Sequence, residues 1–240
     1  MQTLFDLMRS RQSARVPFDP GHKLAPDVLQ DLLRAAAWAP TAHNMQNFEI
    51  LVIDDARILE AIGRITTQPT AAFIRENFAL LAFSREELRC KRTGLLASGF
   101  PSAWVTHAGN LDEVAANSAP LPLGRSLQGA PCLLLVLYDP HKRAPDSEGD
   151  RLGLISLGCV LQNLWLAAHA AGVGMQILSV FSTPPVEAQL RRMLDIPERL
   201  HIAYSCRLGY PVASPEYERV RRPVGEFTSH NGYHHRGLYC

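Results

Sequence analysis

The feature that most constrains the fold is a long stretch without charge, since no Asp, Glu, Lys or Arg occurs between Arg151 and Glu187. Its first half predicts a helix from about Leu154 to Ala171 that is apolar on nearly every side, and such a helix is either buried in protein or embedded in a membrane. Gln162 and Asn163 lie near its middle, and a glycine-containing break and a strand-like run follow it, which counts against a membrane span. We therefore expect a helix that protein covers on every side, and no membrane insertion.

Complete burial of a helix is difficult to arrange in a single chain of 240 residues. A second copy that packs along the same helix would provide the missing cover, because the two copies then share one apolar surface. The sequence therefore predicts an obligate homodimer whose interface runs along this helix.

Charge and cysteine content narrow the class of protein. The 24 basic and 23 acidic residues give a formal net charge of +1, which lacks the basic excess of a protein that binds nucleic acid or an acidic membrane. The five cysteines are widely spaced and form no C-x-x-C pair, and Met1–Arg11 lacks the apolar core of a secretory signal, so we expect a cytoplasmic protein with reduced thiols. His230, His234 and His235 near Cys240 fit no common zinc spacing, and no metal site is predicted.

Hydrophobic periodicity predicts the regular elements. The apolar run Phe48–Ile53 is expected to form a central strand of a sheet. The other predicted strands are Cys132–Tyr138, Met175–Phe181 and Ile202–Leu208. The predicted helices, besides the long one, are Thr3–Met8, a helix opened by Ala25-Pro26-Asp27 and ended at Pro40, Ala56–Ile65, Ala71–Phe83 and Pro185–Leu194. Because helices and strands mix without strict βα alternation, we predict an α+β fold.

The stretch from Arg85 to Arg125 has no sustained period and contains several glycines and prolines, which predicts loops and short helices. Irregular segments of this length often act as lids or determine specificity. Phe100, Trp104 and His107 in this stretch either stack on a substrate or pack within the lid.

The domain organisation is predicted to be simple. No linker, charge block or repeat divides the chain, so residues 1–240 are expected to form a single domain. Residues 210–240 have little apolar periodicity and are expected to form an extended C-terminal tail.

Three polar clusters are candidates for binding an anionic ligand. Neither G-x-G-x-x-G after a strand nor G-x-x-x-x-G-K-[ST] occurs, so a bound phosphate would be held by side chains. Two guanidinium groups with a hydroxyl between them suit that purpose. Each cluster alone also has an ordinary explanation, as a solvated basic turn, a helix stop with turn residues, or a basic coil. The clusters are Arg11-Gln12-Ser13-Ala14-Arg15, Ala39 to Phe48, and Arg219-Val220-Arg221-Arg222-Pro223.

In this order the three clusters resemble the nitroreductase family of FMN-dependent oxidoreductases. The stretch RSRQSARVPFDPGHKLAPDVLQDLLRAAAWAPTAHNMQNFEILVID resembles the family's Arg-x-Ser-x-Arg/Lys turn, its first long helix, its Ala-Pro-Ser-x-x-Asn-x-Gln-Pro connection and its first strand. The stretch SLGCVLQNLWLAAHAAGVGMQIL is similar to the family's central helix and the Gly-Leu-Gly before a strand, and the Arg-rich tail also matches. Thr41 stands where Ser is usual and Asn47 where Pro is usual, and no correspondence covers Arg85 to Arg125.

The resemblance implies a nitroreductase-like fold, with a central mixed or antiparallel sheet flanked by helices, and an intertwined homodimer. Each of two FMN sites in the interface would be built from both subunits. Within the turn that also contains Gln12, the resemblance implies that Arg11 binds the FMN phosphate, Ser13 the ribityl chain and Arg15 the pyrimidine edge near N1 and O2.

The other implied cofactor-binding residues come from three places. The partner subunit would contribute Pro40, Thr41, Ala42 and Asn44. The strand after Gly174 would present backbone amides to flavin N5 and O4 around Gln176, Ile177, Leu178 and Ser179. The tail would close on the phosphate through Arg219 and either Arg221 or Arg222.

The resemblance also implies an activity: hydride transfer from NADH or NADPH through FMN to a nitroaromatic, quinone or related electron-poor acceptor, with ping-pong kinetics. A fixed cation such as Arg15 beside N1 and O2 would stabilise the reduced flavin. No dedicated acid, base or nucleophile is required, so no catalytic side chain is assigned. The alternatives are another flavin chemistry on the same fold, such as dehalogenation, flavin breakdown or oxidation of a heterocycle, and a flavin-binding protein without enzymatic activity.

Overall fold

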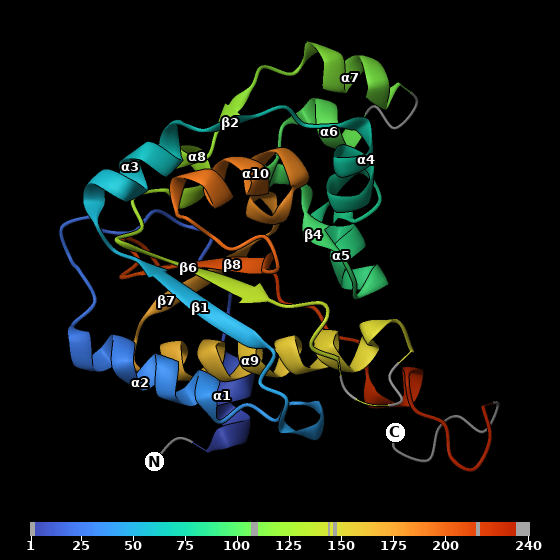
Figure 1. Cartoon of the computed structure of the whole chain (residues 1–240). Coiled ribbons are helices and arrows are strands. Elements are labelled where there is room, and N and C mark those ends of the chain that lie inside the picture. The colour runs from blue at the N-terminus through green and yellow to red at the C-terminus, as the bar shows by residue number, and fades with distance from the viewer. Residues whose placement is uncertain (1–2, 107–109, 144, 146–147, 215–216, 234–240) are drawn as a thin grey trace. The chain divides into compact units, whose positions relative to one another are not determined.

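The computed structural model describes residues 3–106, 110–143, 145, 148–214 and 217–233 (Figure 1). The chain divides into two compact units, the first made of Met1–Thr67 and Pro122–Pro215, the second of Gln68–Leu121 and Glu216–Cys240. Each unit therefore combines two stretches of chain that lie far apart in the sequence. The expected single domain over residues 1–240 stays a prediction.

The first unit contains a four-stranded sheet in which every neighbouring pair is antiparallel, as the described residues show. The sheet therefore confirms the α+β class and the antiparallel form of the expected sheet. In spatial order its strands are β1 (Phe48–Ile53), β6 (Cys132–Tyr138), β8 (His201–Gly209) and β7 (Gly174–Leu178).

Two of the predictions about strands are wrong. Phe48–Ile53 does not form a central strand: β1 lies at one edge of the sheet, where Glu49 is exposed, and β6 and β8 occupy the centre. The strand predicted as Met175–Phe181 ends at Leu178, because the chain turns there into the 3₁₀ helix η5 (Ser179–Ser182). Ser179 is therefore not a strand residue.

Strand β6 shows why the sheet is covered on both faces. Its residues are buried alternately in two apolar clusters, Leu133, Leu135 and Leu137 in one and Cys132, Leu134 and Val136 in the other. A strand buried on both sides reads as a continuous apolar run. The helices in the first cluster are α3 (Ala56–Arg64), α8 (Gly124–Leu127) and α10 (Pro184–Met193), and those in the second are α2 (Pro26–Ala37) and α9 (Arg151–Ala170). Figure 1 shows the two groups of helices on opposite faces of the sheet.

The long helix α9 is the helix predicted from the charge-free stretch, and it carries a charged residue only at its first position, Arg151. One face is buried against α2 and the sheet through Leu157, Val160 and Leu164. The opposite face leaves Leu154 and Ile155 55% and 62% exposed, so the chain alone does not cover the helix on every side. Within the described residues α9 is the one helix long and apolar enough to cross a membrane, but core helices meet the same criteria, and α9 packs as a core helix.

The N-terminal helix α1 (Leu4–Ser10) begins where the sequence predicts it. The Thr3 hydroxyl accepts a hydrogen bond from the Asp6 N–H, and the Asp6 carboxylate accepts one from the Thr3 N–H, which completes a capping box. The short elements of the first unit not yet named are η1 (Ala42–Asn44), β2 (Thr66–Thr67) and η4 (Glu148–Asp150).

The second unit has its own small core. Ile74 and Trp104 are buried there with Leu111 and Ala115, and Phe78 packs against the Trp104 ring at a centroid distance of 5.0 Å. Trp104 and Phe100 therefore pack within this unit, as one of the two alternatives predicts, whereas His107 lies outside the described residues. The elements of this unit, including β5 at its border with the first, are α4 (Ala71–Ile74), the π-helical turn η2 (Arg75–Ala79), β3 (Ala82–Phe83), α5 (Arg85–Lys91), β4 (Leu95–Leu96), η3 (Ala97–Gly99), α6 (Ser102–Thr106), α7 (Leu111–Asn117), β5 (Leu121–Pro122) and η6 (Val224–Glu226).

The expectation of loops and short helices over Arg85 to Arg125 is confirmed by these elements. The expectation of one helix over Ala71–Phe83 is wrong, because the chain forms α4, a π-helical turn and then β3, which pairs in parallel with β4.

Candidate functional site

The first polar cluster, Arg11–Arg15, is a turn that follows α1 and lies along the outer edge of β7; we call it the basic turn. The Ala14 N–H donates a hydrogen bond to the Met175 carbonyl oxygen at 3.0 Å. Ala14 is buried, Ser13 is half-buried and Arg15 is exposed. The attachment to β7 therefore directs the small residue into the protein and leaves the Arg15 guanidinium at the surface.

Phe18, which follows the basic turn in the chain, fills a hollow in the sheet. Gly174 and Gly209 are paired across β7 and β8, and neither carries a side chain. A Cβ on Gly174 would lie 2.7 Å from Phe18 Cε1 and 3.0 Å from Ala14 Cβ, and a Cβ on Gly209 would lie 3.0 Å from Phe18. The two glycines thus leave the space that Phe18, only 2% exposed, fills.

A buried arginine, Arg207, also holds the chain at the end of the basic turn, and the sequence alone did not identify this residue. Arg207 on β8 has no exposed surface, and its guanidinium carbon lies 4.7 Å from the centroid of the Phe18 ring. The signal in the sequence was one charged residue inside the otherwise uncharged strand Ile202–Leu208. Its hydrogen bonds run to Gln176 Oε1 (2.9 Å), Leu127 O (2.8 Å), Ala14 O (3.0 Å), Val16 O (3.1 Å) and Gln128 Oε1 (3.0 Å).

Arg11 lies against the second half of α9. Its guanidinium carbon is 4.3 Å from the centroid of the Trp165 ring, and the Ser10 hydroxyl is 2.8 Å from His169 Nε2. The indole Nε1 of Trp165 is buried and has no hydrogen-bond partner among the described residues. A buried N–H without an acceptor carries an energetic cost of about 1–3 kcal/mol.

Most of the second polar cluster, Pro40–Asn47 within the stretch Ala39 to Phe48, forms a strained loop between α2 and β1; we call this loop the polar loop. His43, Asn44 and Gln46 have φ angles of 51°, 51° and 44°, in the left-handed region that costs non-glycine residues about 1 kcal/mol or more each. Strain of this kind persists where surrounding contacts impose it, and it is common at functional sites.

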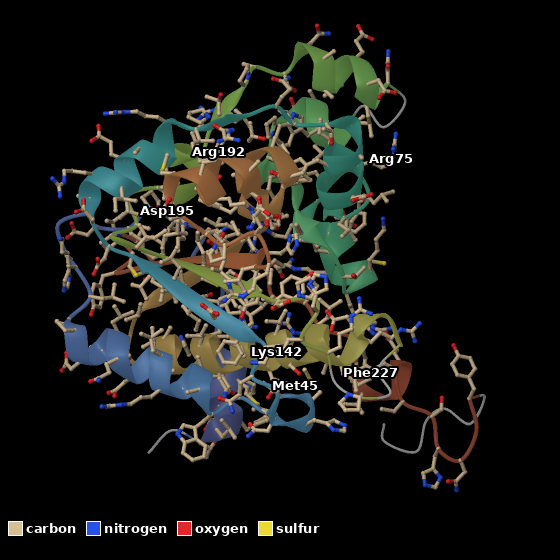
Figure 2. All side chains as sticks on the ribbon, in the orientation of Figure 1. Met45, Arg75, Lys142, Arg192, Asp195 and Phe227 are labelled. Atoms are coloured by element: carbon tan, nitrogen blue, oxygen red, sulfur yellow. The ribbon has the colours of Figure 1, made fainter. Side chains whose placement is uncertain are left out.

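Hydrogen bonds impose this conformation. The Ala42 N–H donates to Ser156 Oγ on α9 at 3.0 Å, and the Gln46 N–H donates to Thr41 Oγ1 at 3.1 Å. The Lys142 ammonium donates to the Gln46 carbonyl oxygen at 3.4 Å, and Figure 2 shows Lys142 near Met45 of this loop. The predicted residues Thr41 and Ala42 are thus structural members of the loop as well as candidate ligands.

The two clusters lie at different positions along one helix. The basic turn contacts α9 at Trp165, and the polar loop contacts it at Ser156. Nine residues of helix at 1.5 Å each separate these contacts by about 14 Å. Within one chain, therefore, the structure attaches the two clusters to opposite halves of α9 and does not bring them together there.

The candidate residues of β7 lie next to the basic turn. The Met175 carbonyl faces the outer edge of the sheet, and alternation along a strand directs the backbone groups of Ile177 to the same edge. Gln176 and Leu178 are tied to β8, since Gln176 Oε1 accepts from Arg207 and the Leu178 carbonyl accepts from Ser205 Oγ at 2.7 Å. Among the candidate residues of β7, Ile177 is therefore the one whose amide faces the sheet edge along which the basic turn lies.

The third polar cluster belongs to the second unit, where α5 holds it in place. Glu218 accepts hydrogen bonds from Arg85 at 2.9 Å and from Arg89 at 2.7 Å, and Arg92 pairs with Glu226. The bond from Arg89 is the main reason that the pKa of Glu218 lies below its usual value.

The candidate arginines Arg219, Arg221 and Arg222 are exposed on this segment. The Arg222 guanidinium lies 5.6 Å from the centroid of the Phe227 ring, which Figure 2 labels. Because the basic turn belongs to the other unit, the expected convergence of the two groups of arginines on one phosphate stays a prediction.

No cluster of three or more His, Cys, Asp or Glu side chains suited to a metal occurs among the described residues. His230 lies in the described part of the tail, whereas His234, His235 and Cys240 lie outside it.

Comparisons with known proteins identify the family. Protein DrgA of Synechocystis sp. is 26% identical over 168 residues, which are 70% of this chain and 67% of that protein. A nitroreductase family protein from Clostridium difficile 630 has the same fold, with a TM-score of 0.62 at 17% identity over 96% of this chain and 99% of that chain. A nitroreductase with bound FMN from Bacteroides fragilis NCTC 9343 gives a TM-score of 0.58 at 18% identity over 95% of this chain and 98% of that chain. The sequence model described as "Nitroreductase family" matches residues 8–210, from the end of α1 to the end of β8. Because this match covers most of the chain and the expected fold is confirmed, the protein belongs to the nitroreductase family.

Proposed function

We propose that the protein is an FMN-dependent oxidoreductase that takes hydride from NADH or NADPH and reduces a nitroaromatic, quinone or related electron-poor compound by a ping-pong mechanism. Family membership and the relatives with bound FMN support this proposal. The observation that carries it is the basic turn, whose backbone is hydrogen-bonded to the sheet edge at Met175, two residues before Ile177.

The residues of this site fit FMN. A phosphate requires fixed cations, and the Arg11 guanidinium is fixed against the Trp165 ring. A ribityl chain requires small polar partners, and Ser13 is half-buried between the two arginines. The pyrimidine edge of a flavin carries acceptor atoms, and Arg15 provides a surface cation on the same turn.

The chain's contribution is mainly positioning and electrostatics. FMN, when bound, would supply the hydride-transfer chemistry at N5. Arg15 beside N1 and O2 would favour the reduced state by stabilising negative charge that develops there. The backbone at Ile177, Leu178 and Ser179 would hold N5 and O4, and no side chain is required to act as acid, base or nucleophile.

The proposed site requires a homodimer. Leu154 and Ile155 expose an apolar face on α9, and Trp38 at the end of α2 is 84% exposed, so a second copy packing on this surface would bury what the chain leaves open. The separation of about 14 Å between the two contacts on α9 gives a second reason. With a two-fold partner, Pro40, Thr41, Ala42 and Asn44 of one protomer would meet the basic turn of its partner.

The remaining parts of the proposal concern the tail and the cell compartment. Arg219 with Arg221 or Arg222 would complete the phosphate site once the tail closes on it. A near-neutral charge and widely spaced cysteines, four of them free in the described part of the chain, support a cytoplasmic enzyme.

The proposal is tested by anaerobic stopped-flow spectroscopy of the purified holoprotein. We expect rapid bleaching of the oxidised-flavin absorption on mixing with NADH or NADPH, and its return on mixing with a nitroaromatic or a quinone. Failure of both nucleotides to reduce bound FMN contradicts the proposed activity and favours another flavin chemistry or a flavin-binding role. A colourless protein that does not bind added FMN refutes the cofactor assignment itself.

A further inference from the structure

Arg207 is a cation at the centre of the sheet of the first unit. It lies on β8 between Cys206 and Leu208, and all three residues have no exposed surface. Burying a charge is unfavourable unless hydrogen bonds replace the lost water. The protein therefore keeps this guanidinium where an apolar residue would be expected, and its contacts show what it holds.

The partners of Arg207 come from three separate parts of the first unit. The guanidinium joins β7 through Gln176, the end of α8 through Leu127, and the basic turn through Ala14. Since a guanidinium is planar and its donors have fixed directions, these bonds set the three parts in one relative position. A lysine has a single nitrogen and cannot reach all of these oxygens at once.

The bonds to the turn lie on both sides of one residue. A single nitrogen, Nη2, donates to the carbonyl oxygens of Ala14 at 3.0 Å and Val16 at 3.1 Å, and Arg15 lies between them. The same nitrogen donates to Gln128 Oε1 at 3.0 Å. The backbone from which the Arg15 side chain projects is thus fixed directly to β8.

We infer that Arg207 is a positioning residue for flavin binding, which fixes the backbone around Arg15 and so places the Arg15 cation at the flavin. This inference rests on the proposed function of the basic turn. Its consequence is specific: Arg207 contributes to FMN affinity and to the potential of bound FMN without touching FMN, because it acts through the position of Arg15.

A residue that only stabilises the fold would behave differently. Tyr204→Phe provides the matched control, because Tyr204 lies on the same strand and its buried hydroxyl donates to the Leu157 carbonyl at 3.2 Å, away from the turn. Loss of that bond is expected to lower thermal stability and to leave FMN binding and the flavin potential unchanged.

The experiment compares the wild type, Arg207→Met, Arg207→Lys and Tyr204→Phe. FMN dissociation constants are measured by quenching of flavin fluorescence with apoprotein, and midpoint potentials by dye equilibration. We expect Arg207→Met to bind FMN at least about tenfold more weakly, equivalent to about 1.4 kcal/mol, and to shift the potential to more negative values. The FMN affinity and midpoint potential of Arg207→Lys are expected to lie between those of Arg207→Met and the wild type. Lysine keeps the positive charge but not the several fixed N–H donors of the guanidinium.

Folding and the proposed function are separated by a further measurement. If Arg207→Met does not fold, Arg207→Lys decides: wild-type affinity and potential in this folded variant overturn the inference. Hydrogen exchange of the apoproteins tests positioning without FMN, and we expect faster exchange at the Ala14 and Phe18 amides in Arg207→Lys with unchanged exchange in β6. Unchanged exchange at both amides in Arg207→Lys overturns the inference. If exchange is faster in Arg207→Lys but the wild type does not bind FMN, only the proposed function of the basic turn is refuted.

Discussion

Gly174→Ala tests the close packing of the basic turn on the sheet. An added Cβ would lie 2.7 Å from both Phe18 Cε1 and Pro211 Cγ, and 3.0 Å from Ala14 Cβ. Ordinary van der Waals contact begins at 3.4 Å, so the nearest neighbours must move by about 0.7 Å, the difference between 3.4 and 2.7 Å. The substitution is therefore expected to displace the turn together with Phe18.

Phe18 is held too firmly to move without loss of stability. Its N–H donates to the Gln128 carbonyl at 3.0 Å, and its ring packs against the Arg207 guanidinium at 4.7 Å. Overpacking of a closely packed site costs about 1–3 kcal/mol. A loss of about 2 kcal/mol lowers the Tm of a chain of this length by roughly 4–8 °C.

Differential scanning calorimetry of the apoprotein at fixed protein concentration measures this shift. Gly99→Ala is the control, because a Cβ on Gly99 meets no described atom within 4 Å, and its effect should stay within about 0.5 kcal/mol. FMN titration of both variants should show weaker binding in Gly174→Ala alone. A Gly174→Ala protein with the Tm and FMN affinity of the wild type would refute the packing described here.

Three other perturbations test the separate parts of the site. Arg11→Ala should weaken FMN binding roughly 10- to 150-fold, the equivalent of about 1.5–3 kcal/mol, in fluorescence titrations, whereas Arg9→Ala, on the preceding helix α1, should not; equal affinities would exclude Arg11 from the phosphate site. Ile155→Glu should give a monomeric mass in light scattering because it places a charge in the proposed interface, and Ile58→Glu, on the exposed side of α3, should remain dimeric; a dimeric Ile155→Glu protein would place the interface elsewhere. Because the folded-state pKa of Glu218 is depressed, its bonds to the α5 arginines stabilise the tail above the unfolded pKa and are lost as the pH falls through the folded pKa. Hydrogen exchange should therefore show the tail loosening on acidification in the wild type and already at neutral pH in Glu218→Gln, and a pH-independent tail in the wild type would contradict this.

The strands whose bounds were predicted most accurately are those that neighbouring residues in the sequence define. The bounds of β1 and β6 coincide with the apolar runs Phe48–Ile53 and Cys132–Tyr138, because acidic residues follow each run and end the burial. The order of strands in the sheet is not local information. Glu49 offered the hint that was overlooked, since a charged residue within an apolar strand is typical of a sheet edge.

The region Ala71–Phe83 shows a different limit. Its composition favours a helix, but Ala82 and Phe83 pair with β4, beyond the turn at Gly94. Gly94 has a φ angle of 96°, and a Cβ there would clash with the Leu81 carbonyl oxygen, so only a glycine lets the chain pass this close to Leu81. The pairing of Ala82 and Phe83 with residues thirteen positions later overrides their local preference for helix. The periodicity within Ala71–Phe83 does not reveal this pairing.

The sequence predicted the residues proposed to bind FMN, but not the residues that hold them in position. The Arg-x-Ser-x-Arg pattern of the basic turn is visible in a few consecutive residues. The hollow at Gly174 and Gly209 exists only because the register of β7 and β8 pairs these two glycines. Arg207 likewise gains its role from carbonyls that the fold brings to it, so its importance depends on tertiary structure.

The absence of charge from α9 after Arg151 is explained by the two surfaces that this helix presents. Leu157, Val160 and Leu164 bury one face of the helix against the sheet of the same chain, while Leu154 and Ile155 present the other face to the proposed partner. A charged side chain on either face would lose its water in the proposed dimer, and the cost would recur in both protomers if the dimer is two-fold symmetric. Polar groups are tolerated on α9 where a bond is available, as at Ser156, whose hydroxyl donates to the Leu152 carbonyl and accepts from Ala42. The absence of charge within α9 after Arg151 thus follows from one helix serving both as the core of a protomer and as the proposed interface.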